Sequence, residues 1–422
     1  MNDNNIPEWV TLDNAAKIFP HSTTKRDTRV YRLICSLKEN VEKKYLQEAL
    51  LLTVEDFPLY KAVLKRGLFW YYLETSSLKP VVTEEKDPIF SPLYYGSMSL
   101  LFRVSYYKKR INLEVFHVLA DGAGGFEFLR SLVANYLKLK YASKFKNKKI
   151  NLNYNASMSE KLDDSFKKYY DNRGPKKAKI PTNSYLLKGP KYRESRLEVI
   201  EGVMSLKELL ALARSKKTTL AVLLTALFMK AIKEEMPFRE LNKNVVIAIP
   251  VNLRQFFNSN SARNFFGVFD VPYNFKKSSD ELEVVLDYLN EFFKGKLNYE
   301  EMSCRINNLV SLEDNILIRP IPLVIKNYAL KFSSKYLDRT STAQVSNVGR
   351  VEMPSEMREY IEFFGATDCT EKMKMCLCSF EDKVYISLVS PFINSNVQKN
   401  FYKQLSSLGI KITLTSNANI GG

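Results

Sequence analysis

The sequence predicts a mixed α/β protein folded in two lobes, each with a mixed sheet and flanking helices. Its 422 residues are more than a single hydrophobic core usually serves, and they suit two lobes of about 200 residues each. Strand and helix patterns are mixed, without internal repeats or a regular βαβ alternation, which favours two layers per lobe. A polar, basic stretch divides the chain. We therefore expect an N-terminal lobe at residues 1–145, an inter-lobe linker at 146–195 and a C-terminal lobe at 196–422.

The first half alternates strands with helical segments. The expected elements are a strand at 29–37, a helix within 42–64, a strand at 68–74, and a hairpin of strands 99–106 and 111–117. In the second hairpin strand, Ile111, Leu113, Val115 and His117 point to one face, so His117 continues an inward apolar row. A glycine-rich loop and a helical pattern from Phe126 to Leu137 follow, giving a strand, loop and helix unit.

The second half begins with a strand near Arg196. Ser205 and Glu208 form a capping-box pattern at the start of a helix. The expected elements after it are a helix at 219–235, strands at 244–254, 263–275 and 343–353, a helical stretch at 280–335, a hairpin within 372–392 and a closing helix at 395–409.

The formal net charge of +17 indicates an anionic partner or a highly soluble surface. Between Lys138 and Lys191 the chain has 15 Lys or Arg and four Asp or Glu, which accounts for most of the excess. Two explanations fit this basic stretch: it keeps the protein soluble, or it attracts a phosphorylated ligand or an acidic carrier protein. Nucleic acid is disfavoured because zinc-finger, RNA-binding and groove-reading patterns are all missing.

Composition predicts a cytoplasmic protein without a membrane span. The N-terminus lacks a basic and an apolar signal region, and the longest apolar stretch, near residues 220–229, is about half the length of a span. The five cysteines form no CxxC pair, and Cys376 and Cys378 alternate along a strand, which favours packing over metal binding.

Residues 117–122, His-Val-Leu-Ala-Asp-Gly, resemble the HxxxDG motif of the acyltransferase superfamily that includes chloramphenicol acetyltransferase, condensation domains and alcohol acetyltransferases. Residues 249–254, 263–269 and 346–354 are similar, in the same order, to its arginine-bearing strand, its G-x-F strand and its Ser-Asn-x-Gly segment. Phe116 stands where condensation domains usually have a second histidine, and the DFGWG motif of plant members is missing. The resemblance covers nearly the whole chain and implies a two-lobe chloramphenicol-acetyltransferase-like fold with an active-site tunnel between the lobes.

The resemblance implies transfer of an acyl group from a thioester to a hydroxyl or an amine. A neutral imidazole within reach can take the acceptor's proton, and His117 is the candidate base. The alternative is that His117 is only a buried ring. The other histidine, His21, lies in a polar loop pattern and is expected at the surface. No nucleophile-elbow pattern is present, so no acyl-enzyme is expected.

The position of Asp121, four residues after His117, makes it a candidate catalytic partner, but the resemblance implies a structural role. Asp121 would face away from the substrate and pair with Arg254, which would hold the loop that aims the histidine. Gly122 would leave room for the thioester arm. Ser346 and Asn347 are candidate donors to the oxyanion, or else only part of a turn. Phe265, Phe266 and Gly267 are expected to line the tunnel wall.

The sequence thus predicts an acyltransferase acting on a small-molecule alcohol or amine, with acyl-CoA as co-substrate and no permanently bound cofactor or metal. One alternative is ester or amide formation from an acyl carrier protein. Another is a catalytically inactive relative that acts as a binding module.

Overall fold

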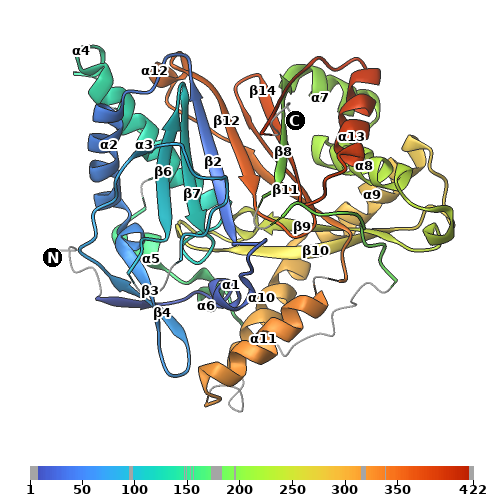
Figure 1. Cartoon of the computed structure of the whole chain (residues 1–422), viewed down its shortest axis with the longest axis horizontal. Helices are drawn as coiled ribbons and strands as arrows, with labels where there is room; N and C mark the ends of the chain where they lie inside the picture. The colour runs from blue at the N-terminus through green and yellow to red at the C-terminus, as the bar shows by residue number, and fades with distance from the viewer. Residues whose placement is uncertain are drawn as a thin grey trace.

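The structure, a computed structural model, describes residues 8–94, 98–146, 148, 150–152, 154, 156–172, 183–193, 196–314, 320–337 and 339–417. Two large mixed sheets lie side by side, and most helices lie on their outer flanks (Figure 1). This arrangement confirms the mixed α/β class. Within the described residues, no helix is long and apolar enough to cross a bilayer.

The first sheet has five strands in the order β12-β2-β7-β6-β5. Their bounds are β2 Val30–Leu37, β5 Thr83–Glu84, β6 Phe102–Tyr107, β7 Arg110–Phe116 and β12 Ile361–Asp368. β6 and β7 form the expected hairpin, in which Lys108 turns the chain at a left-handed φ of 49°. Helices α2 Lys43–Asp56 and α3 Gly122–Lys140 cover this sheet on its outer side (Figure 1).

The helix expected within residues 42–64 is shorter than that range. α2 ends at Asp56, Pro58 opens a 3-10 turn, and β3 Ala62–Arg66 pairs with β4 Tyr71–Thr75. Proline lacks an N–H donor and its ring clashes with the preceding turn, so the helix cannot continue through this point. A small sheet of β1 Trp9–Thr11, β4 and β3 results.

β12 was not predicted from the sequence. It lies within the range 196–422 expected for the C-terminal lobe, yet it pairs antiparallel with β2 in the first sheet. A side chain at Gly365 would come 2.9 Å from the ring of Tyr385, which belongs to the second sheet. The glycine therefore permits close packing of the two sheets.

The second sheet has seven strands in the order β10-β9-β11-β13-β14-β8-β15. Their bounds are β8 Glu198–Ser205, β9 Val245–Asn252, β10 Phe266–Tyr273, β11 Ala343–Arg350, β13 Met373–Phe380, β14 Lys383–Ser390 and β15 Ile412–Ser416. β10 starts later than the expected residue 263, because the backbone N–H of Phe265 and the side chain of Asn264 bond to the first half instead.

The remaining helices are spread around and below both sheets (Figure 1). They are α1 Phe19–Ser22, α4 Ala142–Phe145, α5 Met158–Leu162, α6 Ser165–Lys168, α7 Leu206–Ser215, α8 Leu220–Glu234, α9 Leu282–Lys296, α10 Tyr299–Asp314, α11 Leu323–Leu337, α12 Ser355–Arg358 and α13 Asn396–Ser407. α5 and α6 fall in residues 146–195, which were expected to form the inter-lobe linker. Phe166 of α6 is fully buried and packs its ring edge-on against Phe265.

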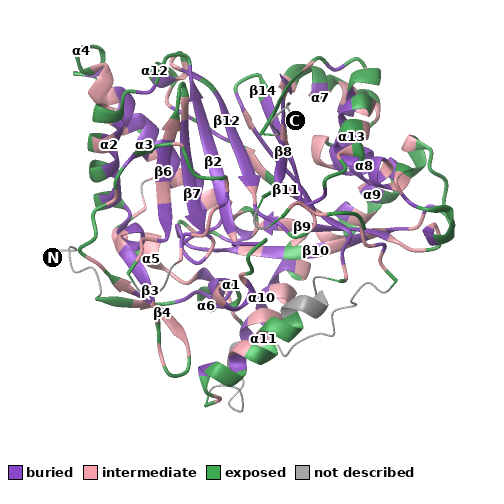
Figure 2. Cartoon of the chain, in the orientation of Figure 1, coloured by how far each residue is buried: buried purple, intermediate pink, exposed green. Residues whose placement is uncertain are grey.

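The apolar residues form two main cores, consistent with two lobes. One core contains β2, β6, β7, α2 and α3 together with β12 residues, and the other surrounds α8 and strands β9 to β11. Figure 2 shows the strands of both sheets as mostly buried, while the outer helices have exposed faces.

Candidate active site

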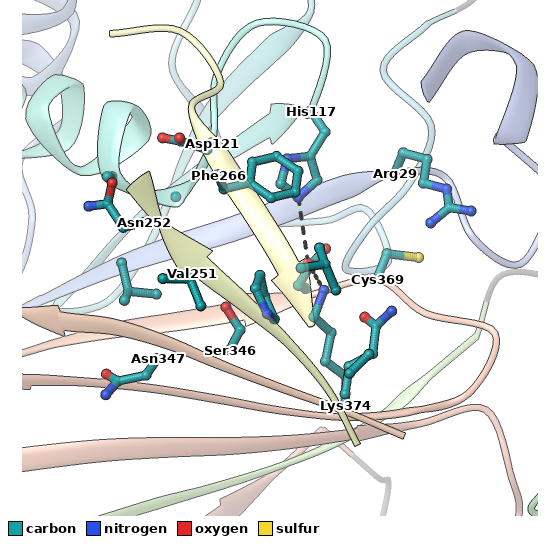
Figure 3. Close-up of a pocket in the computed structure, with 18 of the residues that line it drawn as sticks. Arg29, His117, Asp121, Val251, Asn252, Phe266, Ser346, Asn347, Cys369 and Lys374 are labelled. Atoms are coloured by element: carbon teal, nitrogen blue, oxygen red, sulfur yellow. Dashed lines mark hydrogen bonds and ion pairs between the residues drawn. The ribbon is translucent and has the colours of Figure 1, made fainter. Parts of the chain in front are cut away.

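A cavity of about 240 Å³ lies where the two halves of the chain meet. The first half contributes Phe19, Arg29, His117, Asp121, Gly122 and Ala123 to its lining. The second half contributes Ala248, Pro250, Val251, Asn252, Phe266, Val268, Gln344, Ser346, Asn347, Val348, Asp368, Cys369 and Lys374 (Figure 3). Most residues that the sequence singled out are therefore brought together around one cavity.

His117 follows the last residue of β7 and its side chain reaches the cavity. Its backbone N–H donates to the carbonyl of Arg29 at 2.9 Å, which fixes the start of the loop. The imidazole lies between two rings, with centroids 4.9 Å from Phe19 and 4.6 Å from Tyr31. The His117 side chain is 17% exposed, so it is packed like a core residue but still accessible at one edge.

The two imidazole nitrogens of His117 have different surroundings. Nδ1 is buried and has no hydrogen-bond partner among the described residues. Nε2 lies 3.5 Å from Oδ2 of Asp368, which also lines the cavity. This separation is too long for a strong hydrogen bond. Nε2 is thus the nitrogen that can meet a ligand.

Asp368 and Lys374 form a buried ion pair beside His117, and neither was singled out from the sequence. Burial raises the pKa of the Asp368 carboxyl, but the adjacent Lys374 ammonium and His117 lower it more, so the pKa lies well below its usual range. Burial lowers the pKa of Lys374, and the Asp368 charge raises it above its usual value. Asp368 therefore stays a carboxylate next to Nε2.

Both carboxylate oxygens of Asp121 accept hydrogen bonds from groups other than the His117 imidazole. As the N-cap of α3 its Oδ1 accepts the N–H of Gly124 at 2.9 Å. Its Oδ2 accepts from the backbone N–H of Phe265 at 2.8 Å and from Nη1 of Arg254 at 2.7 Å. In Figure 3 the carboxylate lies apart from the His117 ring, on the side of Asn252.

Arg254 joins the Asp121 loop to the segment before β10. Besides Asp121, its guanidinium donates to Oδ1 of Asn252 at 3.2 Å, to the carbonyl of Ser261 at 2.9 Å and to the carbonyl of Arg263. The expected ion pair is therefore one part of a network that fixes both loops. Charge-assisted bonds of this kind hold geometry better than neutral ones.

The glycine-rich loop expected before Phe126 is already helical, because α3 begins at Gly122, and the need for glycine falls on Gly124 and Gly125 in its first turn. A Cβ at Gly124 would lie 2.0 Å from the carbonyl oxygen of Ala262, and one at Gly125 would lie 2.4 Å from the hydroxyl of Tyr31. At Gly122 a Cβ would meet only Val348, at an ordinary 3.6 Å. The protein alone thus does not require glycine at 122, although this residue lines the cavity.

Ser346 and Asn347 both lie on β11 and line the cavity. Ser346 is half-buried, whereas Asn347 is exposed and its Oδ1 accepts the N–H of Gly349 at 3.0 Å. The pairing of β11 with β13 shifts between Asn347 and Gly349, so the strand is irregular here. Phe266 lines the cavity wall, while Phe265 is buried behind it.

The expectation that His21 lies at the surface is wrong. It belongs to the short helix α1, is 7% exposed and packs against the ring of Tyr71 at 5.3 Å. Its polar neighbours in sequence suggested an exposed loop, but they form the helix α1, which packs against α11. Burial lowers the pKa of His21 to about 4.

Other chemistry at the cavity is limited. Burial raises the pKa of the Cys369 thiol well above its usual value, so it stays protonated and is a poor nucleophile. Cys376 and Cys378, expected to pack, are both buried. The described residues contain no group of three metal-ligating side chains that could hold an ion.

The fold is shared with solved structures, although no family model and no curated protein match the chain by sequence. The trichothecene 15-O-acetyltransferase of Fusarium sporotrichioides is 12% identical, with a TM-score of 0.62 over 94% of each chain. F. sporotrichioides TRI101, solved with coenzyme A and T-2, is 10% identical, with a TM-score of 0.61 over 96% of this chain and 99% of that one.

A condensation domain has the same architecture. The first condensation domain of the calcium-dependent antibiotic synthetase is 14% identical, with a TM-score of 0.59 over 95% of this chain and 96% of that one. At these identities the likeness shows the fold alone. The chain has the two-lobe chloramphenicol-acetyltransferase-like fold, as the HxxxDG resemblance implied.

Proposed function

We propose that this protein is an acyltransferase that moves an acyl group from a thioester, acyl-CoA, to the hydroxyl of a small-molecule acceptor. The observation that carries the proposal is the position of His117, whose Nε2 faces a cavity between the lobes while the rest of the ring is packed. The solved relatives named as acetyltransferases, and the one solved with coenzyme A, support this reading.

His117 would act as the general base. Its Nε2 takes the proton of the acceptor hydroxyl while the oxygen attacks the thioester carbonyl carbon. The tetrahedral intermediate then expels the thiolate, which takes the proton back from the imidazolium. The products are an ester and the free thiol, and no covalent acyl-enzyme is formed.

Ser346 and Asn347 would donate to the oxyanion of the intermediate, and Gly122 would face the thioester arm. The support is their common place on the cavity wall. Asp121 and Arg254 would be positioning residues, because their contacts hold the loop rather than the substrate.

Asp368 would be a second positioning residue, for the acceptor. Its ionised carboxylate lies beside Nε2, so an acceptor hydroxyl that reaches Nε2 also passes Oδ2. An anion there also stabilises the imidazolium that forms as the proton is taken. Lys374 would keep Asp368 ionised and in place.

The cavity holds only the reacting groups, since about 240 Å³ is too small for an entire acyl-CoA. We propose that the rest of the donor lies in a tunnel that continues between the lobes. The basic residues of 138–191 would favour a phosphorylated donor.

The test is thiol release from a panel of acyl-CoA donors with alcohol and amine acceptors, measured with a thiol reagent. We expect acceptor-dependent release and a new ester. Turnover of acyl groups only from a carrier protein would favour condensation chemistry instead. Binding of these ligands without any turnover would favour an inactive binding module.

A further inference from the structure

The helix α11 exposes an apolar face at the edge of the molecule. Val324, Ile325, Tyr328 and Phe332 are 51%, 59%, 75% and 78% exposed. Their spacing along the helix places them on neighbouring turns of one side. Figure 2 shows α11 with a largely exposed surface, and Figure 1 shows it projecting beyond both large sheets.

The loop between β3 and β4 continues this surface. Leu68 and Phe69 are 72% and 41% exposed. The N–H of Leu323, the first residue of α11, donates to the carbonyl of Leu68 at 2.9 Å, so loop and helix lie together. We call the combined surface the apolar face; it consists of Leu68, Phe69, Val324, Ile325, Tyr328 and Phe332. An exposed apolar cluster of this size on two elements marks an interaction site.

The charge around the apolar face is positive. Residues 66–70 and 323–337 include the exposed Arg66 and Lys331 and no Asp or Glu, whereas Lys326 is buried with its ammonium over the ring of Trp70. In the hairpin, the acid Glu74 pairs with Lys65 at 3.2 Å. Apolar side chains with basic and without acidic neighbours are typical of segments that lie in the surface of an anionic bilayer.

We propose that the apolar face docks the protein on a lipid membrane that carries anionic head groups. A projecting helix and hairpin tip can insert into a fluid surface, whereas they offer a protein partner little continuous area. α11 packs against α1, whose Phe19 lines the cavity, so a docked protein would hold its site close to the lipid. This inference goes beyond the proposed function and does not depend on turnover.

The experiment is co-sedimentation of the full-length protein with vesicles of phosphatidylcholine alone or mixed with phosphatidylserine. We expect binding to the mixed vesicles that weakens with added salt. The double variant Tyr328→Ser, Phe332→Ser should reduce the partition constant about tenfold or more, since it removes two inserting rings. Phe238→Ser is the matched control, because Phe238 is 91% exposed on another surface and should not matter.

Several outcomes would overturn the proposal. One is no vesicle binding at low salt; another is equal binding of the double variant and wild type when both unfold at the same temperature. A dimer by light scattering that the double variant abolishes, without vesicle binding, would make the face a subunit interface. If wild type bound an acidic carrier protein but no vesicles, and the double variant lost this binding, the apolar face would be a protein interface. Turnover with a soluble acceptor distinguishes failure of this inference from failure of the proposed function.

Discussion

At the scale of single residues, the site depends on a division of labour between His117 and Asp121. The imidazole faces the cavity and contacts Asp368, whereas the Asp121 carboxylate contacts Arg254 and two backbone N–H groups. A motif that suggests a catalytic pair thus contains one residue at the reacting centre and one that holds the loop.

Asp121→Asn should destabilise the protein by about 2–4 kcal/mol, because it leaves the largely buried Arg254 charge without its partner. Arg254→Gln should have a similar cost, and the double variant should lose less than the sum, because the two residues act as a unit. Urea unfolding of the four proteins measures this. Additive losses would contradict the account.

His21 predicts a pH dependence of stability. Its pKa is about 4 in the folded protein and 6.5 when exposed, so between these values the unfolded chain binds more protons. Stability should therefore fall as pH falls, by about 2 kcal/mol between about pH 7.5 and about pH 5. Comparison of urea unfolding of wild type and His21→Leu isolates this contribution. An unchanged pH dependence in the variant would show that His21 does not cause it.

At the scale of elements, the turn from β7 into α3 depends on close backbone approach. Gly124→Ala should cost about 3 kcal/mol, because the new Cβ would lie 2.0 Å from the Ala262 carbonyl oxygen and the loop would have to move. Gly122→Ala, two residues earlier in the same turn, should change stability by less than about 0.5 kcal/mol. Thermal unfolding of the pair tests this, and equal losses would refute it.

The elements also show what the sequence could predict. The β6–β7 hairpin, the α3 helix and the β13–β14 hairpin have local patterns, and the order of the motifs indicated the partner of Asp121. β12 escaped prediction because it is buried on most of its length and contains Gly365, so it shows neither alternation nor a clean apolar run. Asp368 was missed with it, and its pairing with Lys374 depends on tertiary packing. His21 was misplaced because tertiary contacts bury a polar segment.

At the scale of the whole molecule, the two lobes are coupled. β12 leaves the second half to complete the first sheet, and the Asp121–Arg254 network ties the loops of both halves. The cavity lies at this junction, so its shape depends on how the halves pack.

The two lobes should therefore unfold together. Both tryptophans, Trp9 and Trp70, lie in the first half, and the Trp70 ring contacts Lys326 of α11, so their fluorescence reports the first half and its contact with α11, while circular dichroism reports the whole chain. The two denaturant transitions should coincide. A fluorescence transition at distinctly lower denaturant would show that the first lobe unfolds alone.

The central claim, that Nε2 of His117 takes the acceptor proton, is tested most directly by His117→Ala. With a donor and an acceptor that wild type turns over, we expect kcat to fall by about 100-fold or more, the usual contribution of a general base, with an unchanged folded structure. Undiminished acyl transfer by a folded His117→Ala would contradict the account.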